Sequence, residues 1–293
     1  MRVLVVVPTL GRRDLGPLVR DIAEQRRAAA AVGHEVDALV LHNGSESGPL
    51  RELVIGAGLA YDSHAALGFS QIRNEAVGRA VEGRFDVLVM IDDDERPDPG
   101  WLPALLAPFA AGADVAVGPV RTAWPPDAPQ RFIRSSLPRA TTDPPDGWID
   151  VDLRSGNCAI RVDRLDGLRF DDRFDAAGGE DTAMFRRLRA AGARCYWVGA
   201  ASVTELVDPS RVRLRYFARR AYGQGRSYAV IQRLLPRADD PRPVAVLRLR
   251  AVRAARLGRW SMTRRNIGHL FDSASELAFA LGYVIGRMGG HRG

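Results

Sequence analysis

The chain has 293 residues, of which 46% are hydrophobic and 26% are charged. These values are typical of a soluble globular protein and exclude a disordered or fibrous one. All 42 basic residues are arginine. The chain therefore lacks the lysine that P-loop NTPases place on phosphates and that Schiff-base enzymes use as a covalent partner.

The charge is unevenly distributed along the chain. Residues 1–210 hold 24 arginines and 31 acidic residues, a net charge of −7, whereas residues 211–293 hold 18 arginines and 4 acidic residues, a net charge of +14. Cys158 and Cys195 lie in apolar stretches without metal-ligand spacing, so we expect two reduced core residues. The apolar run before Pro8 is too short for a signal peptide or a membrane span, which predicts a cytoplasmic protein.

Apolar runs of strand length alternate with helix-like segments in the first part of the chain. Strands are expected at 2–7, 36–41 and 85–91, and helices at 15–31 and 101–110. This alternation predicts a Rossmann-like α/β fold, with a mostly parallel sheet flanked by helices. Ligands of such sheets bind at the carboxyl ends of the strands. Here those ends carry the polar segments VPTLGR, LHNGS and MIDDDERPD.

The second half of the chain changes character twice. Residues 121–150 are rich in proline without a clear period, which favours a loop beside a functional site. Strand-like sequence follows at 151–162, then a helix beginning near Glu180 and a strand at 194–199. After Glu205 the sequence becomes arginine-rich and helical. We predict one domain over 1–210, with halves of about 1–120 and 121–210, and a C-terminal helical extension over 211–293.

Four consecutive acidic residues, Asp92 to Glu95, directly follow a strand that is expected to be buried. Unpaired carboxylates are unfavourable there unless a cation neutralises them. Mg²⁺ or Mn²⁺ would suit, because these ions take one or two protein carboxylates together with phosphate oxygens. The alternative is an acidic turn that caps a helix starting near Pro99.

A second acidic pair, Glu180 and Asp181, follows Gly178 and Gly179 at the start of an amphipathic helix. Glycines let a backbone approach a ligand closely, and the first turn of a helix favours anions. The pair is therefore a candidate catalytic site. Acidic residues in a first helical turn are also common capping residues, so the motif alone leaves both interpretations open.

Taken in order, these segments resemble glycosyltransferase family 2, the inverting enzymes of the GT-A fold. VPTLGR resembles the first strand and nucleotide-contacting turn of the family, LHNGS its second strand end, and GFSQIRNEAV its Arg-Asn helix start. IDDDERPDPGWL resembles its DxD element, SGNCAIRVDRL its acceptor-side strand, and GGEDTAMFRRLRAAG its Glu-Asp helix. The resemblance extends from Met1 to about residue 230.

The resemblance implies a role for each matched position. It implies a metal ligand at Asp94 and a catalytic base at Asp181, with Glu180 beside the base. It also implies a nucleotide-sugar site formed by Pro8, Thr9, Arg12, Asn43, Arg73, Asp92 and Asp93.

Two positions depart from the family pattern. Asn43 stands where the family usually has Asp, so a neutral amide would contact the donor base. Glu205 stands where many members have His; it is a further candidate metal ligand, because a carboxylate also suits a hard cation.

The resemblance implies metal-assisted transfer of a sugar from a UDP-, GDP- or dTDP-sugar to an acceptor hydroxyl, with Mn²⁺ or Mg²⁺ as cofactor. The acceptor would be a carbohydrate, a lipid-linked molecule or a small molecule. One alternative is a non-catalytic nucleotide-sugar-binding protein or an arginine-rich interaction protein, and another is a sugar nucleotidyltransferase. Nucleic acid is not an expected partner, because few base-stacking aromatic residues accompany the arginines.

The arginine-rich segment 211–293 has two interpretations. Arg250, Arg253, Arg256 and Arg259 recur at three-residue steps among aliphatic residues, a pattern that suits a basic amphipathic surface on the inner face of an anionic membrane. Helices that pack on the core or form a homodimer would give a similar pattern. From the sequence alone we favour the second interpretation.

Overall fold

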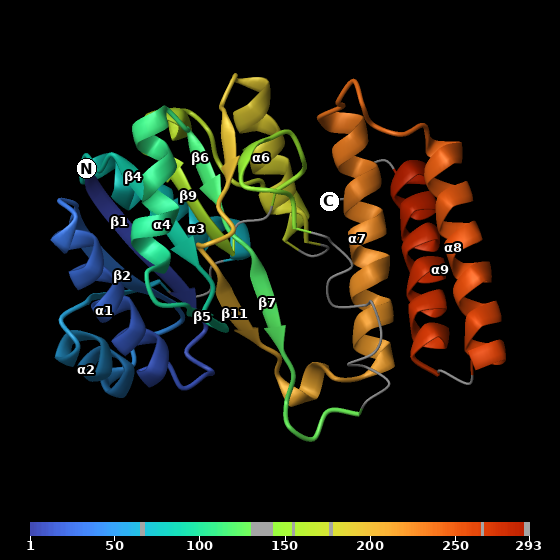
Figure 1. Cartoon of the computed structure of the whole chain (residues 1–293), viewed down its shortest axis with the longest axis horizontal. Coiled ribbons are helices and arrows are strands. Elements are labelled where there is room, and N and C mark those ends of the chain that lie inside the picture. The colour runs from blue at the N-terminus through green and yellow to red at the C-terminus, as the bar shows by residue number, and fades with distance from the viewer. Residues whose placement is uncertain (65–67, 130–142, 154–155, 176–177, 265–266, 290–293) are drawn as a thin grey trace. The chain divides into compact units, whose positions relative to one another are not determined.

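The computed structural model describes residues 1–64, 68–129, 143–153, 156–175, 178–264 and 267–289 (Figure 1). It contains two compact units. The sheet unit comprises residues 1–121, 143–172 and 180–206. The helical unit comprises residues 207–293 together with two earlier segments, 122–142 and 173–179. Within the predicted proline-rich loop, residues 130–142 lie outside the described part of the chain.

An eight-stranded sheet of order β3-β2-β1-β4-β9-β6-β10-β8 forms the centre of the sheet unit. Its strands are β1 (Arg2–Thr9), β2 (Glu35–Asn43), β3 (Ala60–His64), β4 (Val87–Ile91), β6 (Val115–Val117), β8 (Gly147–Ile149), β9 (Asn157–Arg161) and β10 (Cys195–Trp197). Strands β1 to β4 pair in parallel, as do β6 and β10, whereas β9 and β8 run antiparallel to their neighbours. All five residues of β4 are buried, as expected of a strand covered on both faces.

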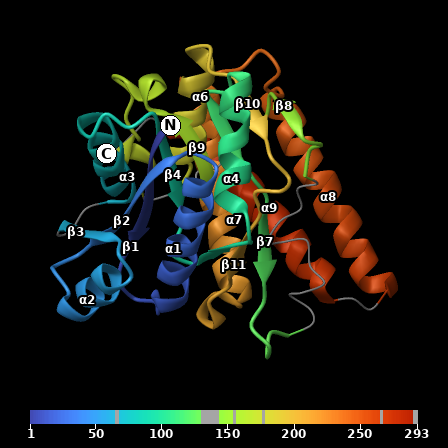
Figure 2. The same ribbon diagram turned by 60° about the vertical axis from the view of Figure 1, so that its left-hand side comes forward.

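Helices cover both faces of this sheet (Figure 2). The helices of the sheet unit are α1 (Gly16–Ala31), α2 (Gly48–Gly56), α3 (Phe69–Glu82), α4 (Trp101–Leu106) and α6 (Glu180–Ala190). Helices α1 and α4 share one apolar core with the sheet, which includes Ile22 and Trp101. Helices α3 and α6 share a second core, which includes Ile72 and Phe185.

A smaller sheet of order β5-β11-β7 consists of β5 (Glu95–Pro97), β11 (Val203–Leu206) and β7 (Val120–Ala123). Strands β5 and β11 are antiparallel, with Glu205 opposite Glu95. Because only three residues, 92–94, separate the end of β4 from the start of β5, the acidic segment passes directly from the large sheet to the small one.

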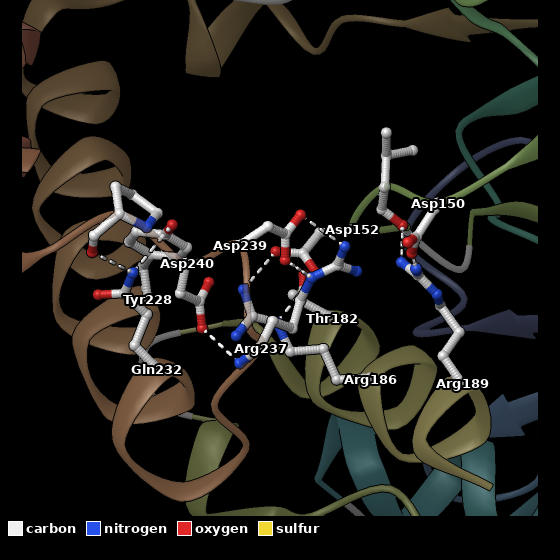
Figure 3. A network of polar contacts seen from close by, with 12 residues as sticks. Asp150, Asp152, Thr182, Arg186, Arg189, Tyr228, Gln232, Arg237, Asp239 and Asp240 are labelled. Carbon is white, nitrogen blue, oxygen red and sulfur yellow. Dashed lines mark hydrogen bonds and ion pairs between the residues drawn. The ribbon is translucent and has the colours of Figure 1, made fainter. Parts of the chain in front are cut away.

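The helical unit contains α7 (Leu214–Leu234), α8 (Pro243–Arg264) and α9 (Ile267–Met288). Gln232 of α7 is buried and donates to the hydroxyl of Tyr228 (Figure 3) and to the carbonyl of Pro241; its Oε1 accepts a hydrogen bond from the hydroxyl of Tyr283. Three protein groups thus satisfy a buried amide, which stabilises the contact between α7 and α9.

The predicted fold class is confirmed: a mostly parallel sheet is flanked by helices, and helices follow residue 211. Two elements are shorter than predicted. The helix expected at 101–110 ends at Leu106, and a 3₁₀ turn that contains Pro108 follows at Ala107–Ala111, because proline lacks the N–H that an α-helix needs there. Of the expected strand at 151–162, the structure describes 151–153 and 156–162, and within these residues Asn157–Arg161 form β9.

Candidate active site

The loop after β1 is tied to the acidic segment. The Thr9 hydroxyl donates to Asp93 Oδ2 at 2.7 Å and accepts from the amide of Gly11 at 2.9 Å. Gly11 has a φ of +66°, and a Cβ there would lie 2.8 Å from Nε2 of His42. Only glycine suits this position. Thr9 therefore lies next to the acids, and the neighbouring Pro8 is half-buried in β1.

Of the two arginines in the loop after β1, Arg13 faces Asp93 and Asp94, and the sequence motifs did not identify it. Its Nη2 lies 3.4 Å from Asp94 Oδ2, and its Nε lies 3.8 Å from Asp93 Oδ1. The predicted Arg12 is exposed instead. The sequence offers two adjacent arginines, and the turn at Gly11 decides which of them points inward.

The four acidic residues after β4 differ in their environments. Glu95 is buried, its Oε2 accepts from the amide of Asp92 at 3.2 Å, and its own amide donates to the carbonyl of Asp92 at 3.1 Å. A Cβ on Gly156 would lie 2.8 Å from Glu95 Oε1 and 3.0 Å from Asp92 Oδ2. Glu95 therefore holds the turn together, and a glycine is needed beside it.

Asn157 of β9 holds the end of β4 that precedes this turn. It lies opposite Ile91 in the pairing of β4 with β9. Its Oδ1 accepts from Trp101 Nε1 at 2.8 Å, and its Nδ2 donates to the carbonyls of Pro119 and Ala201 at 3.1 and 2.7 Å. The buried amide thus fixes the end of β4 relative to α4 and to two loops. The SGN motif had suggested an acceptor-side strand but not this positioning role.

Arg73 of α3 joins the two acidic motifs. Its guanidinium forms an ion pair with Glu180 and donates to Asp92 Oδ1 at 3.4 Å. Burial alone would lower the pKa of Arg73, but the charges of Asp92, Glu180 and Asp181 raise it. Arg73 therefore stays charged and neutralises part of the site. Burial also raises the pKa of Glu180, against the opposing effect of Arg73.

Asp181 and Glu205 act electrostatically on the end of β4. Desolvation raises the pKa of Asp92; Arg73 opposes this shift, while the carboxylates of Asp93, Asp181 and Glu205 add to it. Arg73, which pairs with both Asp92 and Glu180, joins the acids that follow β4 to those at the start of α6. The structure thus brings the two predicted acidic motifs into one site.

Arginines in the second half of α6 bind the chain at 150–152 (Figure 3). Arg186 is buried and binds Asp152 through two hydrogen bonds of 2.9 and 2.6 Å. Arg189 donates to the carbonyl of Val151 at 2.9 Å. The fork geometry of Arg186 restricts orientation as well as distance, so it fixes α6 relative to the chain at 150–152.

The end of β2 carries the predicted Asn43, which is half-buried and has a polar partner. Beneath it, His42 Nδ1 lies 3.0 Å from the hydroxyl of Tyr61, which also accepts from the amide of Ser47 at 3.1 Å. A Cβ on Gly44 would lie 2.9 Å from His42 Nε2. The His42 ring thus supports both the loop after β1 and the loop after β2.

The carboxylates that follow β4 and the carboxylate of Glu205 in β11 are oxygen ligands of the kind that a hard cation binds together with phosphate. Asp94 is joined to β11, because its carbonyl accepts from the amide of Leu206 at 2.7 Å, and Glu205 is the preceding residue. No group of three or more His, Cys, Asp or Glu side chains arranged to hold a metal occurs among the described residues. Mg²⁺ and Mn²⁺ do not need such a group, because one or two carboxylates are enough when phosphate and water complete the shell. Asp94 and Glu205 are two carboxylates of the kind that such a site needs.

No protein-family model matches the chain. Over 149 residues it is 34% identical to the succinoglycan biosynthesis protein ExoM of Rhizobium meliloti (strain 1021). The aligned part covers 49% of this chain and 47% of that protein. The chain thus spans about half the length of this curated relative.

Solved structures cover more of the chain. The mannosyltransferase PcManGT from Pyrobaculum calidifontis, in complex with GDP-Man and Mn²⁺, has a TM-score of 0.62 at 16% identity and covers 97% of this chain and 86% of that one. This chain has the GT-A glycosyltransferase fold. The resemblance to glycosyltransferases that the motifs indicated is thereby confirmed.

Two further GT-A structures agree. Residues 1–349 of S. aureus TarS give a TM-score of 0.52 at 13% identity, covering 100% of this chain and 93% of that one. GalNAc-T7 with UDP, GalNAc and Mn²⁺ gives 0.51 at 15% identity, covering 78% of this chain and 50% of that one. Within this GT-A sheet, the candidate site lies at the carboxyl ends of β1, β2 and β4, where ligands of parallel sheets bind.

Proposed function

We propose that the chain is an inverting, metal-dependent glycosyltransferase of family 2 that moves a sugar from a nucleotide-sugar donor to an acceptor hydroxyl. The observation that carries the proposal is the position of Arg73, whose guanidinium pairs with Glu180 at the start of α6 and with Asp92 directly after β4. Two acidic motifs separated by more than 80 residues lie in one site. The GT-A neighbours in complex with GDP-Man, or with UDP, and Mn²⁺ support a nucleotide-sugar donor.

The proposed reaction is a single displacement at the anomeric carbon. The acceptor oxygen forms a bond to this carbon as the bond to the diphosphate oxygen breaks, and Asp181 takes the acceptor proton. Thr182 donates its amide to Asp181 Oδ1 at 2.6 Å, which orients the carboxylate and leaves Oδ2 to accept the proton. Glu180 holds Arg73 in place and is thus a positioning residue.

The remaining residues bind the donor in this proposal. The nucleoside contacts Pro8, Thr9 and Asn43. The loop after β1 also contributes Arg12 and Arg13, and the ribose lies toward Asp92 and Asp93. Asp94, with Glu205, would hold Mn²⁺ or Mg²⁺, which supplies positive charge to the diphosphate when bound. Arg73 lies beside the donor and limits the net negative charge of the site.

Replacing Asp181 by Asn tests the catalytic role. We expect turnover to fall by about 10²- to 10⁴-fold, because an amide cannot accept the proton, while donor binding changes less than about twofold. Nucleoside diphosphate release with a panel of nucleotide sugars measures turnover, and calorimetry measures binding. Asp163→Asn is the matched control, because Asp163 is an exposed aspartate that pairs with Arg161. Turnover of Asp181→Asn near the wild-type rate would refute the proposed role.

Replacing Asp94 by Ala tests the metal site. In the wild type, Mn²⁺ should strengthen donor binding and EDTA should remove this gain, because the cation bridges carboxylate and diphosphate. The Asp94→Ala chain should bind the donor equally weakly with and without Mn²⁺, whereas Asp166→Ala, at an exposed position, should behave as the wild type. An unchanged response to Mn²⁺ in calorimetry would contradict the assignment. If the wild type binds a donor but releases no nucleoside diphosphate, it is a binding protein and not an enzyme.

A further inference from the structure

Helix α9 of the helical unit presents an apolar face outward. Its exposed large aliphatic side chains keep between 41% and 77% of their surface accessible. We name these residues the aliphatic stripe: Leu270, Leu277, Leu281, Ile285 and Met288. Their spacing of three, four or seven residues places them on one side of the helix.

The opposite side of α9 packs against α7. Gly282 and Gly286 of α9 meet the backbone of Tyr222 and Arg226 in α7, and the buried Tyr283 bonds to Gln232. The position of a residue around a helix advances by about 100° at each step, so the stripe points away from α7. A helix that faces water would carry polar residues at these positions. A continuous exposed aliphatic stripe therefore indicates a binding surface.

Helix α8, beside α9, supplies positive charge. Its sequence contains no acidic residue, and we name its exposed arginines the α8 arginines: Arg248, Arg253, Arg256 and Arg259. Exposed Val244, Val252 and Met262 lie among them on the same helix. Glu276 of α9 pairs with Arg250 at 2.8 Å and approaches Arg253 at 3.9 Å, and Asp272 is buried. The two helices thus present aliphatic groups and arginines to solvent with little compensating negative charge.

We propose that the α8–α9 pair is a docking surface for an anionic phospholipid membrane. The aliphatic stripe would enter the boundary between headgroups and acyl chains, and the α8 arginines would bind lipid phosphates. Arginine suits this role because its apolar stem lies along the acyl region while its guanidinium reaches the headgroups. The surface lies wholly within the helical unit, so the proposal stands apart from the proposed enzymatic activity.

Charge distinguishes this occupant from a second copy of the chain. Residues 211–293 carry a net charge of +14, so two such surfaces facing each other would repel, whereas an anionic bilayer is complementary. Among the described residues, no helix is both long enough and apolar enough to span a bilayer.

Vesicle flotation of the full chain tests the proposal. The probes are vesicles of phosphatidylcholine alone and vesicles with a phosphatidylglycerol fraction, each at low and high salt. We expect flotation with anionic vesicles at low salt, reduced by high salt because screening weakens the arginine contacts. Equal binding to both vesicle types would contradict the role of the α8 arginines, and no flotation under any condition would overturn the proposal.

Two variants separate the apolar and ionic contributions. Leu277→Glu with Leu281→Glu should lower vesicle binding at least tenfold, because charged groups enter the acyl region unfavourably. Arg248→Gln with Arg253→Gln should lower it about fivefold per arginine and reduce its salt dependence. The matched controls carry the same changes at exposed positions of the sheet unit: Val32→Glu with Ile55→Glu, and Arg20→Gln with Arg27→Gln. Both controls should float as the wild type does.

Two further measurements identify other occupants of the stripe. If the wild type sediments as a dimer and the Leu277→Glu, Leu281→Glu variant as a monomer, while neither floats, the stripe binds a second copy and the proposal is wrong. If that variant instead melts at a clearly lower temperature than its control, the stripe packs against another part of this chain, and the proposal is again wrong. A soluble variant with unchanged melting temperature and lost flotation supports it.

Discussion

At the scale of single residues, Arg73 has the largest influence on the candidate site. Its side chain is 12% exposed and faces Glu180, which is 11% exposed, as well as Asp92. Asp181 adds a third negative charge nearby. A buried cation surrounded by acids is stabilising only as long as every partner remains. Glu180 and Asp92 therefore depend on Arg73 for their charge balance, while Arg13 faces Asp93 and Asp94.

We expect Arg73→Met to lower the free energy of unfolding by about 3–5 kcal/mol at neutral pH, because it leaves Glu180 and Asp92 without their counter-charge. The loss should shrink as the pH falls. Burial already raises the pKa of both carboxyl groups, and removal of Arg73 raises it further. When the pKa of an acid is higher in the folded than in the unfolded state, its contribution to the free energy of unfolding is fully present below the unfolded pKa. This contribution is lost as the pH rises through the folded pKa.

Denaturant unfolding at several pH values measures this effect. Arg79→Met is the matched control, since Arg79 lies on the same helix, is 42% exposed and pairs with Glu75 and Asp62 at the surface. Its loss should be below about 1 kcal/mol and nearly independent of pH above 5. Equal losses for the two variants would show that Arg73 has no special role.

Single residues also show what the sequence motifs could and could not predict about the candidate site. The motifs identified Thr9, Asp93, Arg73, Glu180 and Asp181, and the structure brings these residues together. They could not show that Arg13 faces the acids or that Glu95 is buried in a turn. Both depend on which way a side chain points after a turn, and neighbouring residues with the same chemistry give no signal for that.

At the scale of elements, the contact between α7 and α9 depends on glycine. A Cβ on Gly282 would meet the carbonyl oxygen of Tyr222, and a Cβ on Gly225 would meet the carbonyl oxygen of Phe279. Because backbone atoms are in the way, a side chain could be accommodated only if the helices moved apart. Glycine is unfavourable in a helix interior, and the close approach of the two backbones is what requires it at these positions.

We expect Gly282→Ala to destabilise the helical unit by about 1–3 kcal/mol, as overpacking does. Gly258→Ala on α8 is the matched control, since the nearest atom to its Cβ would be Ser273 Oγ at 3.6 Å, an ordinary contact. That change should stabilise by up to about 1 kcal/mol through helix propensity. Thermal melting followed by circular dichroism measures both. A stabilised Gly282→Ala chain would mean that α7 and α9 are not closely packed.

Strands buried on both faces were predicted well, and short or interrupted elements were not. The apolar runs at β1, β2 and β4 need no tertiary information, because each is long and continuous. The three-residue strands β5 and β6 have too few residues to show a period. Their pairing partners lie far away in the sequence, so long-range hydrogen bonds define them.

At the scale of the whole molecule, the two units differ in chemistry. The sheet unit contains the carboxylates of the candidate site, and the helical unit contains the arginine-rich helices and the aliphatic stripe. The sequence favoured packing or dimerisation for the latter, because arginines with aliphatic residues fit a packed helix as well as a membrane surface. The exposure of the aliphatic stripe on α9 instead supports the proposed binding to an anionic membrane.

The sequence by itself determined the α/β class, the long buried strands, the order of the acidic motifs and the asymmetry of charge, because these follow from local period and composition. Only the tertiary structure decided that Arg73 joins the two acidic motifs, that Glu205 lies opposite Glu95, and which face of α9 stays exposed. These properties depend on distances between residues far apart in the chain. Such distances arise from strand order and helix packing, which no local pattern encodes.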